Sequence, residues 1–541
     1  MSVRKVWMRM PYLLIAILLS SRAIVTATLF LISSAALAAT PEQIKASVQK
    51  GVAWLVAQQD PDGSWGQSQN SQVAKTGFAV VKLEDLAYEL GKNPFQTDPA
   101  KPDYYVYSQN VIKGLNYIFA NAKARTITPQ PAGNPDTNGN QIGVYWGWLP
   151  AVHTYETGIA MMAIAASRAP DRLVTTGSQA GRSYKEVLQD AVDYFGFGQT
   201  DIGSADRGGW DYVEKDNEST RSDNSTSGYA VLGLRYAQSW GFKCTVPQFV
   251  KSELSIWIDA IQDDVNGDPN DGGSYYTATS PGWVNLLKTG NLLFEMAFVG
   301  DTATTPRVQA AIAYIQRHWD DPNWDPGWKG PALRNGPHYQ AAYCLMKGFE
   351  SLGIDTITVM RSGVPVVVDW FDDMSTAILG TQNADGSWPS DHYDWGDLKN
   401  GSLVYTLSTE WPLLTLERVV PPLEVAIDIR PGSFPNSISL VDKGVVPVAI
   451  LTTNTAKGER LTFDAATVDP KTVRFGPAQA APVQYVLEDV DKDGDTDMIL
   501  HFKTQETGIK AGDTSAALTG KTLKGRAIAG ADSVRTVPPG T

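Results

Sequence analysis

Residues 58–65 read Gln-Gln-Asp-Pro-Asp-Gly-Ser-Trp and follow an apolar segment of helical period over residues 44–59. A second copy, Gln-Asn-Ala-Asp-Gly-Ser-Trp, occupies residues 382–388, also after a helical segment. Residues 208–212 (Gly-Gly-Trp-Asp-Tyr) and 271–275 (Asp-Gly-Gly-Ser-Tyr) are weaker copies of the same loop. A loop that recurs after helices indicates a repeat protein, in which each unit buries its apolar face only by stacking on its neighbours.

The positions of these loops divide residues 41–420 into six helix pairs. The helices that precede the loops are predicted at residues 44–59, 110–122, 184–197, 250–262, 308–318 and 369–382. Those that follow start near a small or hydroxyl-bearing pair, with anchors at Thr76, Thr157, Ser227, Thr289, Gln340 and Thr409. The hydroxyls are expected to cap helix starts, and the glycines beside them to allow close packing. Six such pairs predict a closed double ring, an (α/α)6 toroid, over residues 39–420.

A different pattern begins after Pro421 and Pro422. Short β-type runs, separated by Pro, Gly and Asp turns, occur at residues 425–429, 445–451, 473–475, 485–487 and 498–502. They predict a small all-β, sandwich-like domain over residues 423–541.

Residues 1–38 have the character of a secretory signal peptide. They contain four basic residues, no acidic residue and an apolar run that ends at Ala36-Leu37-Ala38. We expect cleavage after about Ala38 and a secreted protein, periplasmic, extracellular or on the cell surface, that is not integral to the membrane. An uncleaved anchor is the alternative, although neither of the two apolar runs, residues 11–20 and 23–37, reaches the roughly 20 residues that span a bilayer.

Composition excludes several classes of function. The 541 residues include 45 Lys+Arg and 58 Asp+Glu, a formal charge of −13 that argues against nucleic acid as a partner. Two cysteines, Cys244 and Cys344, cannot form a disulfide scaffold, and we expect buried thiols. The sequence has no phosphate-binding loop and no dinucleotide fingerprint, so no nucleotide cofactor is expected.

The loop at residues 50–65, with Lys50, Gly51, Trp54, Gln59 and the Gly-Ser-Trp triplet, resembles the QW repeat of squalene–hopene cyclases. The resemblance extends to the terpene cyclase/prenyltransferase superfamily of α/α toroids. It implies that the glutamine caps a helix end and ties neighbouring repeats together, a role that identifies a fold without identifying a reaction.

The catalytic signatures of that superfamily are missing. The Asp-x-Asp-Asp acid of the cyclases does not occur in the helical part, and Asp369, Asp372 and Asp373 are expected only to favour a helix N-terminus. Residues 337–345 resemble the zinc segment of protein prenyltransferases, but Gln340 stands where the ligand histidine would be. No zinc is therefore expected.

In such toroids the starts of the inner helices line one mouth of a central cavity. The candidate catalytic residues at this mouth are Glu156, His338, Glu410 and Asp211. The candidate ligand-binding residues are Trp146, Trp148, Tyr155, Trp210, Trp283, Trp328 and Tyr339. Aromatic walls with acids suit a hydrophobic, isoprenoid-like ligand through cation–π contacts, or a glycan whose rings stack on tryptophan.

Residues 489–497 alternate aspartate with other residues around Gly494. Asp489, Asp491, Asp493, Asp495 and Asp497 offer oxygen ligands of the kind that Ca2+ prefers, so the sequence predicts a calcium site. Residues 427–438 and 444–451 also resemble an accessory domain of exported bacterial proteins, which suggests contact with a cell-surface component.

Three functions stay open from sequence alone. The first is an exported toroid that binds a hydrophobic or isoprenoid-like ligand. The second is a secreted glycan hydrolase or lyase that uses the cavity carboxylates, and the third is a non-catalytic surface or interaction protein.

Overall fold

The computed structural model describes residues 38–67, 71–147, 153–213, 221–323, 325, 327–329, 337–454, 457–459 and 461–537. The predicted signal peptide, apart from its last residue, lies outside this set. Among the described residues, no helix combines the length and apolar character needed to cross a membrane.

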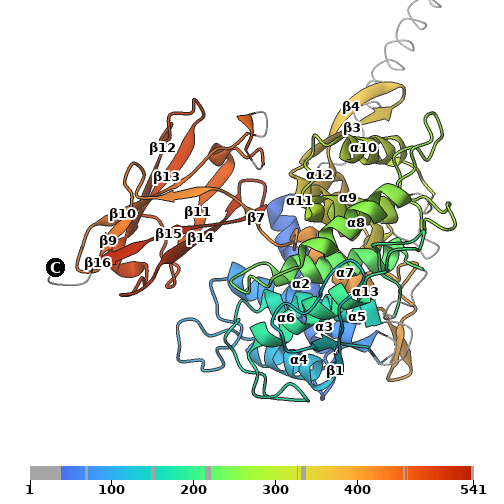
Figure 1. Cartoon of the computed structure of the whole chain (residues 1–541), viewed down its shortest axis with the longest axis horizontal. Coiled ribbons are helices and arrows are strands. Elements are labelled where there is room, and N and C mark those ends of the chain that lie inside the picture. Colours follow the sequence, from blue (N-terminus) through green and yellow to red (C-terminus); the bar gives the residue numbers. More distant parts are fainter. Residues whose placement is uncertain are drawn as a thin grey trace, which may run out of the picture.

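The described chain has twelve helices, which make up the helical part in Figure 1. Their packing forms an inner and an outer ring. The outer helices are α2 (Pro41–Ala57), α4 (Ser108–Ala120), α6 (Tyr184–Gly198), α8 (Gln248–Ile261), α10 (Pro306–His318) and α12 (Trp370–Leu379). The inner helices are α3 (Gln72–Glu89), α5 (His153–Ala166), α7 (Asn224–Ala237), α9 (Leu286–Val299), α11 (Tyr339–Leu352) and α13 (Leu407–Leu416). Each inner helix packs on the next, and α13 packs on α3, so the inner ring closes. The predicted (α/α)6 toroid is confirmed.

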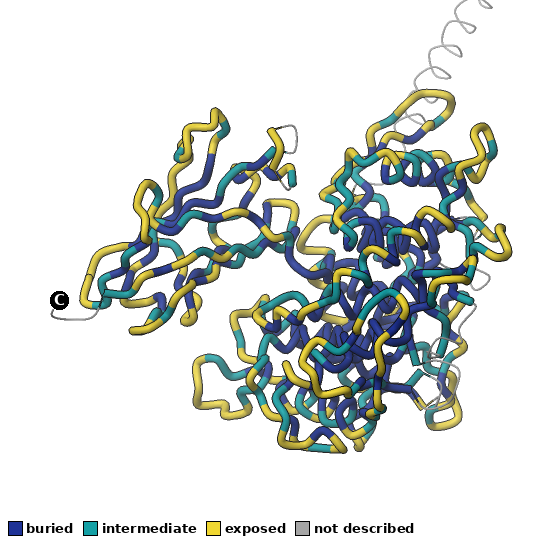
Figure 2. The backbone as a smooth tube through the Cα atoms, in the orientation of Figure 1, coloured by how far each residue is buried: buried dark blue, intermediate teal, exposed yellow. Residues whose placement is uncertain are grey.

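Buried backbone is concentrated in the inner helices (Figure 2). Glycines allow these helices to approach closely, because a Cβ on Gly158 would lie 2.1 Å from the carbonyl oxygen of Tyr229 on α7. At Gly290 on α9, a Cβ would lie 2.6 Å from the amide nitrogen of Leu345 on α11. The close packing expected at the anchor glycines is therefore present.

The Gln–Gly–Trp loops tie successive repeats together by the same hydrogen bonds. The Gln59 side chain donates to Gly63 O in its own loop and to Asn110 O in the next outer helix, both at 3.0 Å. Trp65 donates its indole N–H to Leu55 O at 2.7 Å. Gln199, Gln262 and Gln382 repeat the glutamine pattern. Since Gln382 donates to Ser47 O of α2 at 2.9 Å, the last repeat is bonded to the first.

The anchor hydroxyls have a different role from the one predicted. Thr76 accepts a hydrogen bond from the backbone N–H of Trp65 at 3.0 Å and donates to Gln72 O at 2.7 Å. Thr157 and Ser227 accept equivalent bonds from Trp146 and Trp210. The prediction that they cap helix starts is wrong, because helices α3, α5 and α7 begin three or four residues earlier. These hydroxyls instead fix the preceding loop on the helix.

The ends of the inner helices differ in how they leave the helical conformation. After α9 and α11 the left-handed residue is glycine, Gly300 and Gly353. After α5 and α13 it is arginine, since Arg168 has φ 52° and Arg418 has φ 53°. A non-glycine residue in this region costs about 1–2 kcal/mol, so the side chains at these two positions are retained at the expense of stability.

Small hairpins decorate the rings. They comprise β1 (Lys123–Thr126) with β2 (Ile142–Tyr145), β3 (Thr356–Arg361) with β4 (Val364–Asp369), and β5 (Asp397–Lys399) with β6 (Ser402–Val404). Asp369 caps α12 by accepting the backbone N–H of Phe371 at 3.0 Å, as its position at a helix start predicted.

Beyond α13 the chain forms a β-sandwich, which Figure 1 shows beside the helical rings. One sheet has the order β12-β13-β10-β8 and the other β11-β14-β15-β7. The strands are β7 (Leu423–Glu424), β8 (Ile427–Ile429), β10 (Val445–Ile450), β11 (Val468–Phe475), β12 (Gln484–Glu488), β13 (Asp497–Lys503), β14 (Ser515–Thr522) and β15 (Ala527–Ser533). Strands β9 (Ser437–Ser439) and β16 (Arg535–Val537) pair with each other in parallel. Phe475 and Phe502, from opposite sheets, lie 5.1 Å apart between ring centroids in the sandwich core.

The sandwich docks on the C-terminal ends of the inner helices. Glu350 of α11 is buried and forms ion pairs with Arg418, which follows α13, and with Arg526 of the β14–β15 turn. Lys521 of β14 binds Glu89 of α3 at 3.1 Å. The opposite, N-terminal ends of the inner helices are not covered by these strands, and they are called the mouth below.

Candidate functional site

An arginine clamped by two aspartates lies at the mouth where α7 begins. Asp223 caps α7 by accepting the backbone N–H of Thr226 at 2.9 Å, and its other oxygen accepts from Arg221 at 2.9 Å. The same guanidinium forms an ion pair with Asp211. The predicted catalytic residue Asp211 is thus a partner of Arg221, and its carboxylate helps to fix the loop.

Tyrosines surround this ion pair. The guanidinium of Arg221 lies 5.4 Å from the ring of Tyr212 and 5.7 Å from that of Tyr276, and the two tyrosine hydroxyls are 2.8 Å apart. Tyr155 of α5 donates its hydroxyl to Ser225 at 2.7 Å. Burial, followed by the charge of Asp223, raises the pKa of Tyr155 well above its usual range. The phenol of Tyr155 is therefore a neutral hydrogen-bonding group at physiological pH.

A tryptophan extends this surface into solvent. Trp283 is 72% exposed, and its ring centroid lies 5.8 Å from that of Tyr276. The ammonium of Lys288 lies 5.7 Å from Tyr276 and 5.9 Å from Trp283. Burial lowers the pKa of Lys288 to about 8, although Asp325 and Asp223 oppose this effect. Of the predicted ligand-binding tryptophans in the described chain, Trp283 is the one placed to meet a ligand.

A second cluster at the mouth contains the predicted residue His338. Its Nδ1 lies 3.2 Å from Oδ2 of Asp391, and both side chains are buried. Asp391 Oδ2 also accepts the backbone N–H of Gln340 at 2.9 Å. The rings of His392 and Tyr393 lie 6.2 Å and 5.6 Å from that of His338. A histidine held at one nitrogen by a buried carboxylate has its ring orientation fixed, as a proton-transfer group requires.

The two clusters belong to one mouth. Burial raises the pKa of Tyr393, and the charges that add to this effect come from Asp325 and Asp391, with Tyr212 a further electrostatic neighbour. Tyr212 belongs to the Arg221 cluster and Asp391 to the His338 cluster. Residues that are more than 100 positions apart in sequence are therefore electrostatic neighbours at this end of the ring.

Below this surface lie the predicted acids Glu156 and Glu410. Burial raises the pKa of Glu156 to about 8 and that of Glu410 well above its usual range. Lys75 is an electrostatic neighbour of both, but its ammonium is paired with Asp397 at 2.8 Å. Both oxygens of Glu410 and one of Glu156 have no hydrogen-bond partner in the described chain. The sequence predicted them as catalytic residues at the mouth, and the structure places both side chains in the buried layer beneath it, on α5 and α13.

Four of the predicted ligand-binding residues lie in the core, where a ligand at the mouth cannot contact them. Trp146 and Trp210 are at most 1% exposed and donate their indole N–H groups to carbonyls of the outer helices α4 and α6. Trp328 is fully buried against Trp319, and Tyr339 donates or accepts a hydrogen bond with Thr381 of the outer layer. Trp148 lies outside the described residues.

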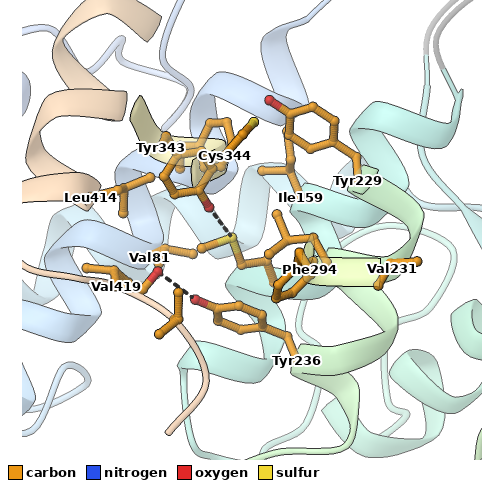
Figure 3. Close-up of a cluster of buried hydrophobic side chains, with 14 of the residues drawn as sticks. Val81, Ile159, Tyr229, Val231, Tyr236, Phe294, Tyr343, Cys344, Leu414 and Val419 are labelled. Atoms are coloured by element: carbon orange, nitrogen blue, oxygen red, sulfur yellow. Dashed lines mark hydrogen bonds between the residues drawn. The ribbon is translucent and has the colours of Figure 1, made fainter. Parts of the chain in front are cut away.

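The axis of the ring is filled by side chains from the inner helices (Figure 3). Phe78 and Tyr343 meet edge to face at 5.7 Å, and Tyr343 points its hydroxyl at Sδ of Met162, 3.9 Å away. The ammonium of Lys347 lies 5.0–5.3 Å from the rings of Tyr229, Phe294 and Tyr343. The amine of Lys347, whose pKa is lowered by burial, therefore occupies the aromatic environment that a carbocation would need.

The aspartate loop of the β-sandwich brings some of its predicted ligands together. Oxygens of Asp489, Asp491 and Asp493 lie within 4.8 Å of one another, and all three residues are exposed. Lys457 binds both Asp493, at 3.0 Å, and Asp495, at 2.7 Å, and buried Asp497 accepts the backbone N–H groups of Thr452 and Val490. Three of the five carboxylates thus fit a hard cation, whereas Asp497 is committed to the fold.

Sequence reasoning missed Arg221, Asp391 and Tyr393. Asp391 is 53 residues from His338, so no local spacing signals the pair. The signal that was available is the His-Tyr-Asp-Trp run at residues 392–395, whose Trp395 is 74% exposed.

No family model and no curated protein sequence matches the chain. Among solved structures, the chain is similar to a type II terpene cyclase from Scytonema in complex with merosterolic acid A. The identity is 14%, with 70% of this chain and 97% of that chain covered and a TM-score of 0.39. It is also similar to an α-1,6-mannanase variant of Salegentibacter in complex with α-1,6-mannotetrose, at 12% identity, 69% and 98% coverage and a TM-score of 0.41. A third similar structure is described as a wild-type glycosidase, at 12% identity, 70% and 97% coverage and a TM-score of 0.39.

Proposed function

We propose that this protein binds a carbohydrate at the mouth of the helical ring and acts on it there. The observation that carries the proposal is the solvent-open surface of Trp283, Tyr276 and Tyr212, with its hydroxyls and ion pairs. Exposed tryptophan rings offer stacking surfaces to the C–H faces of sugars, while phenol and carboxylate groups bind sugar hydroxyls.

His338 is the residue we assign to proton transfer. Asp391 holds Nδ1, so the ring has a fixed direction, and Tyr393 stands beside it. Asp211 and Asp223 are tied to Arg221, which makes them better suited to orient a sugar than to exchange protons with it. The class of reaction is glycan hydrolysis or elimination.

The test is calorimetric titration of the mature protein with a panel of neutral and acidic oligosaccharides, together with detection of new reducing or unsaturated ends. Trp283→Ala should weaken binding at least tenfold, and His338→Ala should abolish product formation while changing binding less than threefold. Phe434→Ala removes an 89% exposed aromatic residue of the β-sandwich and serves as the matched control. Unchanged binding by Trp283→Ala would refute the site, and binding without turnover in the wild type would make the protein a lectin-like binder.

A hydrophobic, isoprenoid-like ligand is the second candidate. It is favoured by the aromatic residues on the axis, Phe78, Tyr229, Phe294 and Tyr343, but these side chains would have to separate to admit it. Native mass spectrometry of protein purified from its own host, followed by denaturation, distinguishes the two ligands by mass.

We further propose that the chain is exported, with cleavage after about Ala38. In support, the backbone N–H of Ala39 donates to Thr376 on α12 at 3.0 Å, so the residue after the expected cleavage site is attached to the helical ring. Sequencing the N-terminus of the secreted protein tests this, and a start upstream of residue 30 would contradict it.

The β-sandwich is proposed to bind Ca2+ through Asp489, Asp491 and Asp493 and to contact a cell-surface component. The edge strand β12 supports the second point, since Tyr485, Val486 and Leu487 are exposed on it and no described strand pairs with its outer side. Pull-down from cell envelopes with wild type and a Val486→Lys variant tests it, and equal recovery would contradict it.

A further inference from the structure

A cavity of about 890 Å3 lies at the end of the ring opposite the mouth, between the helices and the β-sandwich. Its helical wall comes from the C-terminal ends of α3, α5 and α7 and from the residues after α13. Its other wall comes from strands β11, β14 and β15. Neither the mouth nor the aspartate loop contributes to it.

Three residues with left-handed backbone line this cavity from the helical side. Arg168 follows α5, Trp240 follows α7 and Arg418 follows α13, with φ of 52°, 47° and 53°. At the ends of α9 and α11 the same conformation is adopted by glycine. Left-handed backbone is more strained at arginine or tryptophan than at glycine. That three such residues surround one cavity indicates that their side chains have a role beyond ending a helix.

The guanidinium of Arg168 is held by aromatic rings, and its Nε makes no hydrogen bond within the described chain. Its guanidinium lies 3.9 Å from the ring of Tyr88 and 5.3 Å from that of Trp240. Its Nε is also shielded from solvent. Tyr88 is fixed in turn by a hydrogen bond to Ser167 O.

The acids near Arg168 balance its charge only in part, with Asp85 an electrostatic neighbour of the guanidinium. Glu84 is buried, and burial raises its pKa well above the usual range, so its carboxyl group is neutral. Of the acids that line the cavity, Glu417 is paired with Lys82 and Glu89 with Lys521. Asp85 lies 3.9 Å from the same Lys82.

Further positive charge comes from the β-sandwich. Lys471 and Arg474 of β11 line the cavity, and Arg474 bonds only to backbone carbonyls, of Lys471 and Val473, among the described residues. The cavity therefore has a positive surplus contributed by both of its walls, beside an aromatic surface of Tyr88, Tyr236 and Trp240.

We propose that this cavity binds a small organic anion, whose carboxylate or phosphate group is held by Arg168 and whose ring lies against the aromatic surface. A planar guanidinium matches both groups in geometry and charge. Because Lys471 and Arg474 belong to the other wall, the bound anion also links the β-sandwich to the helical ring.

The test is titration of the full mature chain with glucuronate, glucose 6-phosphate and inorganic phosphate, with neutral glucose as the reference ligand. At least one of the three anions should bind tenfold or more tightly than glucose, and more weakly as salt rises. A preference for glucuronate would identify a carboxylate ligand, and a preference for glucose 6-phosphate a phosphate ligand. Equal binding of all four would overturn the proposal.

Arg168→Gly removes the cation and suits the left-handed backbone, so it should fold at least as stably as wild type and lose anion binding at least tenfold. Lys243→Gly is the matched control, because exposed Lys243 also has positive φ, 46°, and does not line the cavity. Arg168→Lys keeps the charge without the planar guanidinium. It should bind the anion more weakly than wild type and more tightly than Arg168→Gly. Anion affinity that is unchanged in Arg168→Gly would overturn the proposal even if an anion binds the wild type.

Discussion

The two ends of the same inner helices are stabilised by different kinds of contact. At the mouth, neutral hydrogen bonds from glutamine, tryptophan and hydroxyl side chains recur from one repeat to the next. At the opposite end, no such repeat is present among the described residues, and ion pairs such as Glu350–Arg418 and Glu89–Lys521 attach a separate sandwich. Repeated contacts therefore build the ring, whereas contacts that occur once attach the β-sandwich to its other end.

The largest effect is expected at the repeated contacts. Trp210→Ala should lower the free energy of unfolding by about 3–5 kcal/mol, because it removes a fully buried indole and leaves a cavity. Denaturant titration measures this loss. Trp283→Ala at the same mouth should change the free energy by less than about 0.5 kcal/mol, since Trp283 is exposed. Similar losses in both variants would mean that the mouth has no division between structural and ligand-facing tryptophans.

Removing an ion pair at the opposite end should lower the free energy of unfolding by less, and the effect should be confined to the contact between the ring and the β-sandwich. Arg418→Ala leaves buried Glu350 with one partner fewer and should cost about 3 kcal/mol. It should also expose the segment between α13 and β7 to proteases, and the ring and the sandwich should melt separately. Lys524→Ala, which removes a half-exposed ion pair, is the control and should be close to neutral. A cooperative single transition in Arg418→Ala would show that these ion pairs do not hold the two parts together.

Calcium should affect the sandwich alone. If Ca2+ is present at 100 times its dissociation constant, its removal by a chelator should cost about 2.7 kcal/mol. Asp491→Asn should reduce the response to calcium, whereas Asp497→Asn should destabilise the sandwich with or without it, because Asp497 bonds to backbone. A chelator that shifts the melting of the helical ring would contradict the assignment.

The smallest effect concerns the neutral acids below the mouth. The folded-state pKa of Glu156, about 8, is above the value of about 4.3 for an unfolded chain. Its favourable contribution is therefore complete below pH 4 and is lost as pH rises toward 8. Glu156→Gln should match wild type at pH 4 and exceed it by about 1 kcal/mol or more at pH 8.5, as denaturant titration at both values would show. An equal difference at the two values would mean that the carboxyl group is ionised in the folded state.

Sequence reasoning succeeded where the chain repeats itself. The spacing of Gln59, Gly63 and Trp65, copied at Gln382, Gly386 and Trp388, reflects a hydrogen-bonded geometry that only those residue types provide. It failed where contacts join distant segments once, as for His338 with Asp391. It also failed for Trp146, Trp210 and Trp328, because an aromatic residue in a loop can face either the core or solvent, and only the fold decides which.

The left-handed arginines explain why the sequence gives no signal for the cavity between the helical ring and the β-sandwich. Glycine after a helix is a recognised signal of the helix end. Arg168 after α5 adopts the same left-handed backbone, but the residue types around it do not indicate this conformation. The role proposed for Arg168 depends on the β-sandwich opposite it, which lies more than 250 residues later in the sequence.

The hydrogen bond from Gln382 to Ser47 O has a consequence for how this chain can change over evolutionary time. A linear repeat protein gains or loses units at its ends, and its terminal repeats need polar caps. Here the last unit covers the first, so an added or deleted helix pair would leave a gap or an overlap in the circle. Copy number is therefore fixed at six, and new functions must come from substitution and insertion within the loops.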